Sequence, residues 1–309
     1  MNPTVYIPNL NGGEMLAMTL ESLKPFGDTR VVVVDNGSED DSVAILTERF
    51  PEVELIALEE NIGFGRALNL AVREAPGDPL IFLNNDVECQ PGFIDSLLGG
   101  LVDGIDLVAA VLVQRDAPEL IDSAGVMVEG DTLMAFDYLH GAKLEALNDA
   151  PAPLGPTGGA ALLRHEAFEN VGGFDERIFV YYEDVDLALR MREAGYRCAL
   201  APNARALHAF SATLGSRSGA KFERTGWSRG YLMRRYGVLS KPGPAARAVL
   251  CESMICAGQV LRSHTTRGIR GRLRGWRAGR GLPPLQAPDS GLAELAVTQR
   301  LQLRADRKR

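Results

Sequence analysis

The sequence predicts an α/β fold with a mostly parallel central sheet, and three observations support this. Over the first 115 residues, short apolar and β-branched runs alternate with stretches of helical periodicity. The runs are far enough apart for a helix to cross between them, which is typical of strand–helix–strand units with parallel strands. The clearest run is the four valines at 31–34, as expected of a strand buried on both faces.

The alternation assigns the elements of this part in order. Strands are expected at 5–7, 31–34, 53–58, 80–83 and 107–113. Helices are expected at 14–23, 67–74 and 93–98. Ser38 is expected to open one more helix, because Asp41 follows three residues later in an imperfect capping box.

The pattern changes after residue 115. A hairpin is expected over 125–136, and a proline-rich loop follows it. Gly195 is placed to end a helix as its C-cap. Beyond about residue 215 the pattern is helical and basic. The elements expected before that point are a strand at 158–163, a helix at 185–193 and a strand at 197–200.

Composition excludes several classes of protein. The 309 residues are 46% hydrophobic and 24% charged, so collagen-like, disulfide-scaffold and disordered classes do not fit. No run approaches the roughly 18 apolar residues of a membrane-spanning helix. The first residues, 1–4, lack the basic region of a signal peptide, and the four cysteines lack zinc-site spacing. These features predict a cytoplasmic protein.

Charge is distributed unevenly along the chain. Residues 1–210 hold 13 Lys/Arg and 35 Asp/Glu, a balance of −22. Residues 211–309 hold 20 Lys/Arg and 5 Asp/Glu, a balance of +15. A basic tail of this kind is expected to meet an anionic surface, and the acidic part is a candidate to bind a cation.

Polar groups follow three of the predicted strands. Ligands of an open parallel sheet bind beyond the carboxyl ends of its strands. Asp35 ends the second strand and could bind a nucleobase or ribose, or simply form a turn. Gly63 and Gly65 with Arg66 could approach a phosphate, or form a tight turn, and Leu68 excludes the dinucleotide fingerprint.

Two further positions could bind a metal or act in catalysis. Asp86 follows the fourth strand and could hold Mg²⁺ or Mn²⁺ beside substrate phosphates, or cap the next helix. The segment 181–186 holds three carboxylates in four residues after two tyrosines, and one of them could act as a general base. Acidic residues also suit the first turn of a helix. His208 gains interest only in combination with Asp86.

At this point the sequence resembles family 2 glycosyltransferases, which have the nucleotide-diphospho-sugar transferase (GT-A) fold, and in particular their rhamnosyltransferase-like branch. The likeness covers roughly residues 4–236, in the order of the family's motifs. The stretches that carry it are 31–38, 61–65 with Asn69, 83–87, 157–161, 172–176 and 179–190, followed by His208.

The resemblance implies roles for individual residues. Asp184, or Glu183 beside it, is the catalytic base. Asp86 and His208 bind Mg²⁺ or Mn²⁺, although Asn84 stands where the family's metal motif usually has its first aspartate. The nucleotide-sugar site is expected to consist of Asn9, Asp35, Asn61, Gly63, Arg66, Asn84, Asn85, Gly158 and Gly159.

The resemblance also implies organisation and activity. Residues 1–215 form the GT-A catalytic domain, with a nucleotide-sugar half to about 115 and an acceptor half from about 116, and residues 216–309 form a helical basic region. The chain is expected to be an inverting hexosyltransferase of cell-wall polysaccharide biosynthesis. Its donor is dTDP-rhamnose or a UDP-sugar, and its acceptor is a glycan or a lipid-linked sugar.

Two other functions remain open from the sequence. A degenerate transferase could bind a glycan or a partner protein without catalysis, and Asn84 is its only support. A sugar nucleotidyltransferase would need a basic, glycine-rich loop after the first strand, whereas residues 9–14 contain no basic residue.

The basic tail has two interpretations. Residues 245–261 have an apolar helical face, and seven arginines follow between 262 and 280. Such a combination is typical of an interfacial anchor on anionic lipid, which would make the protein peripheral on the inner face of the cell membrane. The alternative is a helix that packs on the acidic catalytic domain. Nucleic acid is not expected as a partner, because aromatic residues other than Trp276 do not interleave the arginines.

Overall fold

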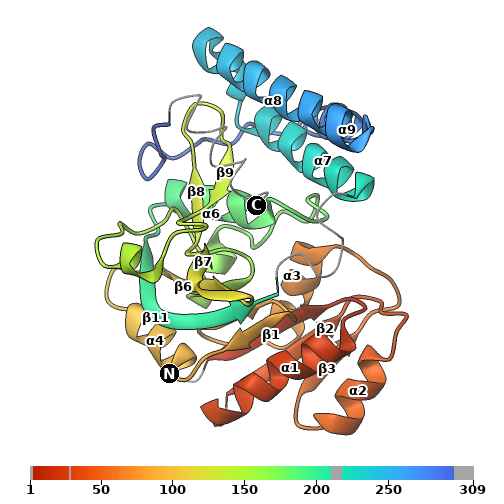
Figure 1. Cartoon of the computed structure of the whole chain (residues 1–309), viewed down its shortest axis with the longest axis vertical. Coiled ribbons are helices and arrows are strands. Elements are labelled where there is room, and N and C mark those ends of the chain that lie inside the picture. Colours follow the sequence, from red (N-terminus) through yellow and green to blue (C-terminus); the bar gives the residue numbers. More distant parts are fainter. Residues whose placement is uncertain (1–2, 28, 210–217, 296–309) are drawn as a thin grey trace.

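The computed structural model describes residues 3–27, 29–209 and 218–295. Within these ranges, nine strands form one mixed sheet with helices on both faces, and a helical layer lies at one end (Figure 1). The path of the sheet runs in the order β3-β2-β1-β4-β10-β6-β11-β5, and β7 pairs beside it with β6. The predicted α/β class is therefore confirmed.

The first half of the sheet is parallel. Strands β1 (Thr4–Asn9), β2 (Arg30–Asp35), β3 (Glu54–Ala57) and β4 (Leu80–Leu83) pair in register along their lengths. The chain moves outward from β1 to β3 and then returns to place β4 on the other side of β1. Strand order thus reverses beside β1, which is where open α/β sheets bind ligands.

The second half of the sheet is mixed. Strand β10 (Ala160–Leu163) runs antiparallel to both of its neighbours, β4 and β6 (Leu107–Gln114). Strand β11 (Cys198–His208) is parallel to β6, and β5 (Val87–Cys89) is antiparallel to β11. The antiparallel strand β7 (Ala117–Ser123) joins β6 near its end. All strand pairs are therefore parallel in the first half of the sheet, whereas the second half combines parallel and antiparallel pairs.

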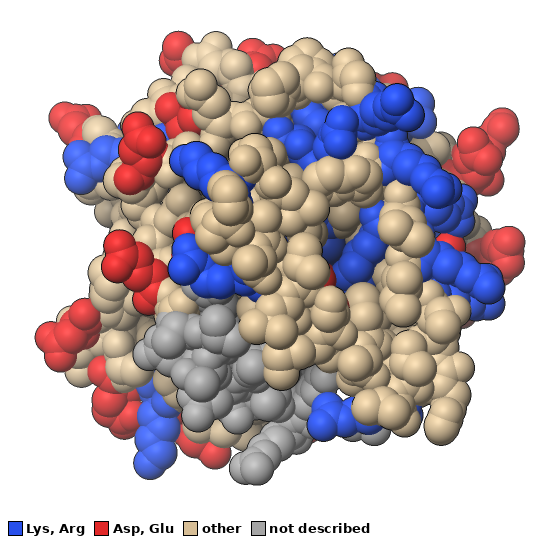
Figure 2. Space-filling view, turned by 90° about the horizontal axis from the view of Figure 1, so that it is seen from above, with Lys and Arg blue, Asp and Glu red and all other residues tan. Residues whose placement is uncertain are grey.

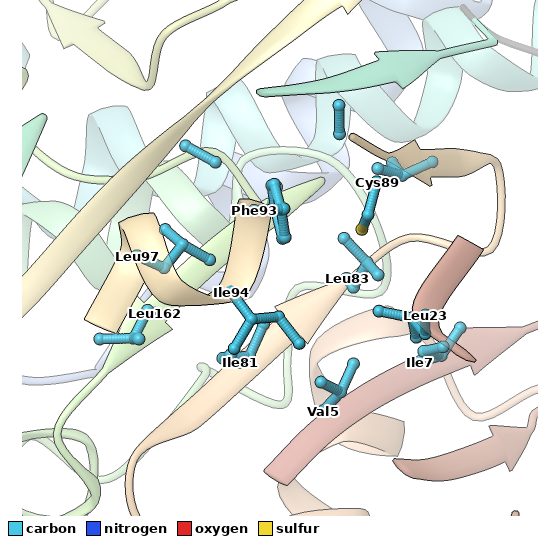
Figure 3. Close-up of a cluster of buried hydrophobic side chains, with 14 of the residues drawn as sticks. Val5, Ile7, Leu23, Ile81, Leu83, Cys89, Phe93, Ile94, Leu97 and Leu162 are labelled. Atoms are coloured by element: carbon cyan, nitrogen blue, oxygen red, sulfur yellow. The ribbon is translucent and has the colours of Figure 1, made fainter. Parts of the chain in front are cut away.

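The helices cover the two faces of the sheet with apolar side chains. One face carries α1 (Gly13–Leu23), α2 (Ser42–Arg49) and α4 (Phe93–Gly100). Figure 3 shows side chains of this cluster meeting from β1, β4, α1 and α4, among them Ile7, Ile81, Leu23 and Phe93. The other face carries α3 (Phe64–Glu74), α5 (His165–Asn170) and α6 (Glu183–Glu193).

A small hairpin and three helices complete the described chain. The hairpin consists of β8 (Val126–Val128) and β9 (Ala135–Asp137), and it ends one residue beyond the range the sequence predicted. The helices are α7 (Gly219–Arg235), α8 (Pro242–Ser263) and α9 (Arg267–Ala278). Side chains of α7 and α8 share a cluster with β8 and α6, so the layer packs on the sheet domain. The domain boundary near 215 stays a prediction.

Glycines bring α7 and α9 into backbone contact. A Cβ atom at Gly230 would collide with the backbone of Arg272, and one at Gly275 would collide with the backbone of Trp227. Any larger residue at either position would push the two helices apart. No helix in the described ranges is both long and apolar enough to cross a membrane.

Two predicted boundaries differ from the structure. Helix α2 begins at Ser42 rather than at Ser38, because the Ser38 amide and hydroxyl instead bind the carboxylate of Asp35, at 2.9 and 2.6 Å. The strand expected at 197–200 continues as β11 to His208, past a register shift against β6 that follows Leu200.

Candidate active site

A chain of amide and carboxylate groups crosses the carboxyl ends of three strands. Asn9, which ends β1, donates from Nδ2 to Asp35 Oδ2 at 2.9 Å. Asn85, just after β4, donates from Nδ2 to Asn9 Oδ1 at 2.7 Å. All three side chains are buried. The structure therefore brings these three predicted nucleotide-sugar residues together where strand order reverses.

Asp35 also forms the turn that follows β2. Its two carboxylate oxygens accept hydrogen bonds from Ser38 and Asn9. Gly37 has a φ of +80°, and a Cβ atom there would meet the backbone of Glu60 at 2.6 Å. The turn and the binding interpretations of Asp35 are thus compatible, because the turn fixes the orientation of the carboxylate.

The segment before α3 joins the two halves of the sheet domain. Asn61 Oδ1 accepts from the Gly63 amide at 2.9 Å and from Asn36 Nδ2 at 3.1 Å. Gly63 has a φ of +98°, and a Cβ atom there would meet the carbonyl oxygen of Phe179 at 2.7 Å. Arg66 lies farther out, with Nε 3.6 Å from Glu176 Oε2 and a side chain that is 55% exposed.

Asp86 and His208 meet at a second corner of the same edge. Asp86 follows β4, His208 ends β11, and Asp86 Oδ1 lies 3.4 Å from His208 Nε2. Within the described ranges, Asp86 Oδ1 and Asn84 Oδ1 are buried and accept no hydrogen bond. Buried oxygens of this kind require an explanation, and coordination of a cation is one. The donors are oxygens and an imidazole nitrogen, which suit Mg²⁺ or Mn²⁺.

The described residues do not supply a complete metal site. They contain no group of three or more His, Cys, Asp or Glu side chains placed to hold a metal ion. Mg²⁺ is usually bound by one or two carboxylates together with substrate phosphates and water. The corner of Asn84, Asp86 and His208 therefore fits a cation that the substrate helps to bind.

The structure adds Asp122 to this corner, which the sequence did not reveal. His208 Nδ1 lies 2.6 Å from Asp122 Oδ2, and His140 Nδ1 lies 2.7 Å from the Asp122 carbonyl oxygen. Burial opposes charge on His208 and Asp122, but the hydrogen bonds between them outweigh it. The pKa of His208 is raised to about 10, and the pKa of Asp122 is held well below its usual range. A cation that binds His208 Nε2 would therefore have to displace the proton on that nitrogen.

The acidic cluster begins α6 through an unusual backbone. Tyr181 and Tyr182 have φ values of +69° and +71°, a left-handed conformation that costs about 1–3 kcal/mol per residue. The cluster's three carboxylates then differ in their surroundings. Asp186 is buried against Arg190, with Asp186 Oδ2 2.8 Å from Nε, and it also accepts from Tyr236. Its role is structural.

Glu183 and Asp184 also differ from each other. Glu183 is buried, and its Oε2 atom accepts no hydrogen bond among the described residues. Burial, and then repulsion by Asp184, raises the pKa of Glu183 well above its usual range. Asp184 is half-buried, and it accepts from the amides of Gly158 and Val185 at 3.0 and 2.8 Å. The two carboxyls thus differ in burial and in hydrogen bonding.

Two adjacent glycines connect the acidic cluster to the metal corner. The Gly158 amide donates to Asp184, while the Gly159 carbonyl accepts from the Asn84 amide at 3.0 Å. A Cβ atom at Gly159 would lie 2.9 Å from Leu112, so the close approach needs a glycine. Asp184 and the end of β4 therefore belong to one site.

The comparison with known families identifies the family of the chain. The model of the family described as "Glycosyl transferase family 2" matches residues 4–172. The chain belongs to this family. The matched range includes the three strand ends and both glycines of the site. The family that the sequence predicted is therefore confirmed.

Curated relatives extend the likeness. An N-acetylglucosaminyl-diphospho-decaprenol L-rhamnosyltransferase of Mycobacterium tuberculosis is 34% identical over 205 residues, which are 58% of this chain and 66% of the relative. A pre-mycofactocin glycosyltransferase of the same species is 32% identical over 66% of this chain and 42% of the relative. The chain thus spans less than two thirds of either relative's length.

Solved structures confirm the GT-A fold. GalNAc-T7, solved with UDP, GalNAc and Mn²⁺, matches 92% of this chain and 55% of its own with a TM-score of 0.62 at 14% identity. The mannosyltransferase PcManGT of Pyrobaculum calidifontis, solved with GDP-Man and Mn²⁺, matches 92% of this chain and 76% of its own with a TM-score of 0.53 at 18% identity.

Proposed function

We propose that this glycosyltransferase moves a sugar from a nucleotide-diphospho-sugar to a hydroxyl group of a glycan or a lipid-linked acceptor, with inversion, in cell-envelope polysaccharide synthesis. The observation that carries the proposal is the glycine pair at 158–159, which holds Asp184 on one side and the strand that leads to Asp86 on the other. A base for the acceptor and a site for the leaving diphosphate are then adjacent.

Asp184 is the proposed base. Its carboxylate removes the proton from the acceptor hydroxyl as that oxygen attacks the anomeric carbon. The attack comes from the face opposite the leaving nucleoside diphosphate, so one displacement inverts the centre and needs no covalent intermediate. Burial, and then the charge of Asp184, raises the pKa of Glu183 and favours its protonated form. We therefore assign proton transfer to Asp184 alone.

The donor is proposed to lie across the strand ends. Asp35, oriented by Asn9 and Ser38, faces the nucleoside, and Asp86 with His208 and Asn84 would hold Mg²⁺ or Mn²⁺ at the diphosphate. A bound cation would offset the negative charge of the leaving diphosphate. Arg66 lies beside Glu176 and is proposed to act at the rim of the donor site.

The similarity to the mycobacterial enzyme supports the choice of substrates. That relative is a rhamnosyltransferase named for an N-acetylglucosaminyl-diphospho-decaprenol acceptor. We therefore favour dTDP-rhamnose as donor, with UDP-sugars as the alternative, and a lipid-linked saccharide as acceptor.

A thermal-shift screen of nucleotide sugars tests the donor. The chain is mixed with Mn²⁺ and with dTDP-rhamnose, UDP-sugars or GDP-sugars, and the true donor is expected to raise the Tm most, because only the folded state binds it. Release of free nucleoside diphosphate on addition of acceptor then shows transfer. Absence of release with every donor that binds would contradict the proposal.

Asp86→Ala is expected to remove the gain in nucleoside diphosphate affinity that Mn²⁺ provides. Loss of a group next to a metal ligand already weakens metal binding by about 10–100-fold, and loss of a direct ligand is expected to cost at least as much. Calorimetry of the nucleoside diphosphate with and without Mn²⁺ measures the effect. Equal affinity in both conditions for the unmodified chain would rule out the metal site.

Asp122→Ala is expected to weaken Mn²⁺ binding by about 10–100-fold, because Asp122 fixes the ring of His208 with Nε2 toward Asp86. Asp122→Glu, which retains a carboxylate, is expected to recover part of the loss. The measurement is the affinity for Mn²⁺ in the presence of nucleoside diphosphate, and affinity without Mn²⁺ is expected to stay unchanged. An equal loss in both conditions would indicate a purely structural role.

A further inference from the structure

Exposed apolar side chains gather on the last two helices. In the described part of the chain, eight large apolar side chains are exposed, and seven of them lie on α8 and α9. Their exposed fractions range from 36% to 76%. Contiguous exposed apolar residues usually mark an interaction surface. The seven are Val249, Leu250, Met254, Val260, Leu261, Ile269 and Leu273.

Helix α8 buries one charged side chain and exposes several large apolar ones. Its buried residues include Glu252, whose carboxylate binds Arg229 and Arg272 at 2.8 and 2.6 Å. Its exposed side instead carries Leu250, Met254 and Leu261, spaced three to four residues or multiples of this apart. A surface helix normally turns its apolar side inward. The outer side of α8 is therefore built to meet something other than water.

The apolar set differs from the one expected from periodicity alone. Within the range 245–261, which periodicity predicts to have an apolar face, Ala248 is fully buried, whereas Val249 next to it is 52% exposed. Glu252 lies on the buried side of α8, where it pairs with arginines. Leu250, Met254 and Leu261 lie on the opposite side of the helix.

Basic side chains surround the apolar stripe. Arg262, Arg267 and Arg270 are exposed, and no carboxylate of the described residues lies within ion-pair distance of them. Arg234, Arg277 and Arg280 line a hollow together with Trp276, and Arg234 stacks 5.0 Å from the centre of that ring. Three guanidinium groups around one hollow suit a phosphate group.

Figure 2 looks onto this end of the molecule. Blue side chains gather beside a broad tan area, and red side chains lie mainly at the margins of the view. The whole chain has a net charge of −7, so a basic end is a local feature. Together, the seven apolar residues and the six arginines 234, 262, 267, 270, 277 and 280 are termed the α8–α9 face.

We propose that the α8–α9 face docks on the surface of a bilayer that contains anionic lipid. The apolar side chains enter the boundary between headgroups and acyl chains, while the arginines contact lipid phosphates, each contributing about 1 kcal/mol near such a surface. The docking itself is independent of the transfer reaction. Only its benefit, access to a lipid-linked acceptor, rests on the proposed function.

The test uses the full chain, because removal of α8 would leave the buried Arg229 without Glu252. The chain is floated with vesicles of phosphatidylglycerol and phosphatidylcholine, or of phosphatidylcholine alone, at low and high salt. Binding is expected with the anionic vesicles at low salt, and about tenfold weaker binding at roughly 0.5 M salt, where charge is screened.

Two pairs of substitutions test the face itself. Leu250→Ser with Leu261→Ser, and separately Arg270→Gln with Arg277→Gln, are each expected to lower the affinity for anionic vesicles about tenfold. Matched controls are Val102→Ser, which is 57% exposed and lies outside the α8–α9 face, and Arg49→Gln on α2. The controls are expected to bind like the unmodified chain.

Several outcomes would overturn the proposal. The unmodified chain could stay in the soluble fraction at low salt, or it could bind neutral vesicles as well as anionic ones. The paired variants could also bind anionic vesicles as well as the unmodified chain does. A dimer that the leucine substitutions dissociate would show that a second copy occupies the face. Hydrolysis of the donor by water, measured without vesicles, separates the two proposals. The variants of the α8–α9 face are expected to retain this hydrolysis. Its absence in the unmodified chain would contradict the proposed function but not the membrane docking.

Discussion

Asp184→Asn is expected to lower kcat for sugar transfer by about 10²–10⁴-fold, while the Kd for the nucleotide sugar stays within about threefold. The substitution retains the volume of the side chain and removes only its ability to accept the acceptor's proton. The proposed donor site lies at the strand ends of β1, β2 and β4, which Asp184 does not touch directly. Single-turnover transfer and calorimetry with the donor measure the two quantities.

Glu183→Gln is the matched control for this substitution. Glu183 is buried with a raised pKa, so the neutral glutamine resembles the protonated form that this pKa favours. We expect a kcat within about threefold of the unmodified enzyme, because the group does not take part in proton transfer. If Asp184→Asn retained normal turnover and Glu183→Gln lost it, the two roles would be reversed.

The second large effect is on stability. Glu252→Ala is expected to lower the free energy of unfolding by about 3–5 kcal/mol, because it leaves a buried guanidinium without its carboxylate. Arg229 is fully buried, and Glu252 is the carboxylate that neutralises both it and Arg272. The carbonyl oxygens of Thr132 and Leu133 satisfy the other nitrogens of Arg229 but supply no charge.

Glu223→Ala serves as the control in the same layer of helices. Glu223 lies 2.8 Å from Arg274, whose side chain is 69% exposed. Exposed ion pairs contribute about 0–1 kcal/mol. Urea denaturation of both variants gives the comparison, and an equal loss in the two would show that burial of Arg229 does not control the energy.

The sequence predicted the parts of the site that follow directly from strand ends. The runs 31–34 and 80–83 are apolar, so the polar residues after them had to lie beyond the carboxyl end of the sheet. The structure places Asn9, Asp35 and Asn85 there in mutual contact. Local pattern was sufficient because parallel strands present their ends on one edge.

Asp122 could not be found in this way. It lies 86 positions from His208 in the sequence, on a strand with no motif. The two meet because β6 pairs with both β7 and β11. The contact between Asp122 and His208 depends on the register of β6, β7 and β11, and the periodicity of the sequence does not specify that register. The inward side of α8 was missed for a related reason, since the buried charge of Glu252 depends on arginines of α7 and α9.

The glycine contact between α7 and α9 gives the two sides of α9 different roles: one side packs against α7, and the other faces solvent. Its inner side holds Gly268, Gly271 and Gly275. Backbone atoms of α7 lie against Gly271 and Gly275 and leave no room for a side chain, and the side chain of Gln259 on α8 fills the space beside Gly268. Arg270 and Arg277 on the outer side take no part in that contact. Substitutions on the outer side can therefore change its charge without changing the packing of α7 against α9, whereas the inner side tolerates almost no substitution.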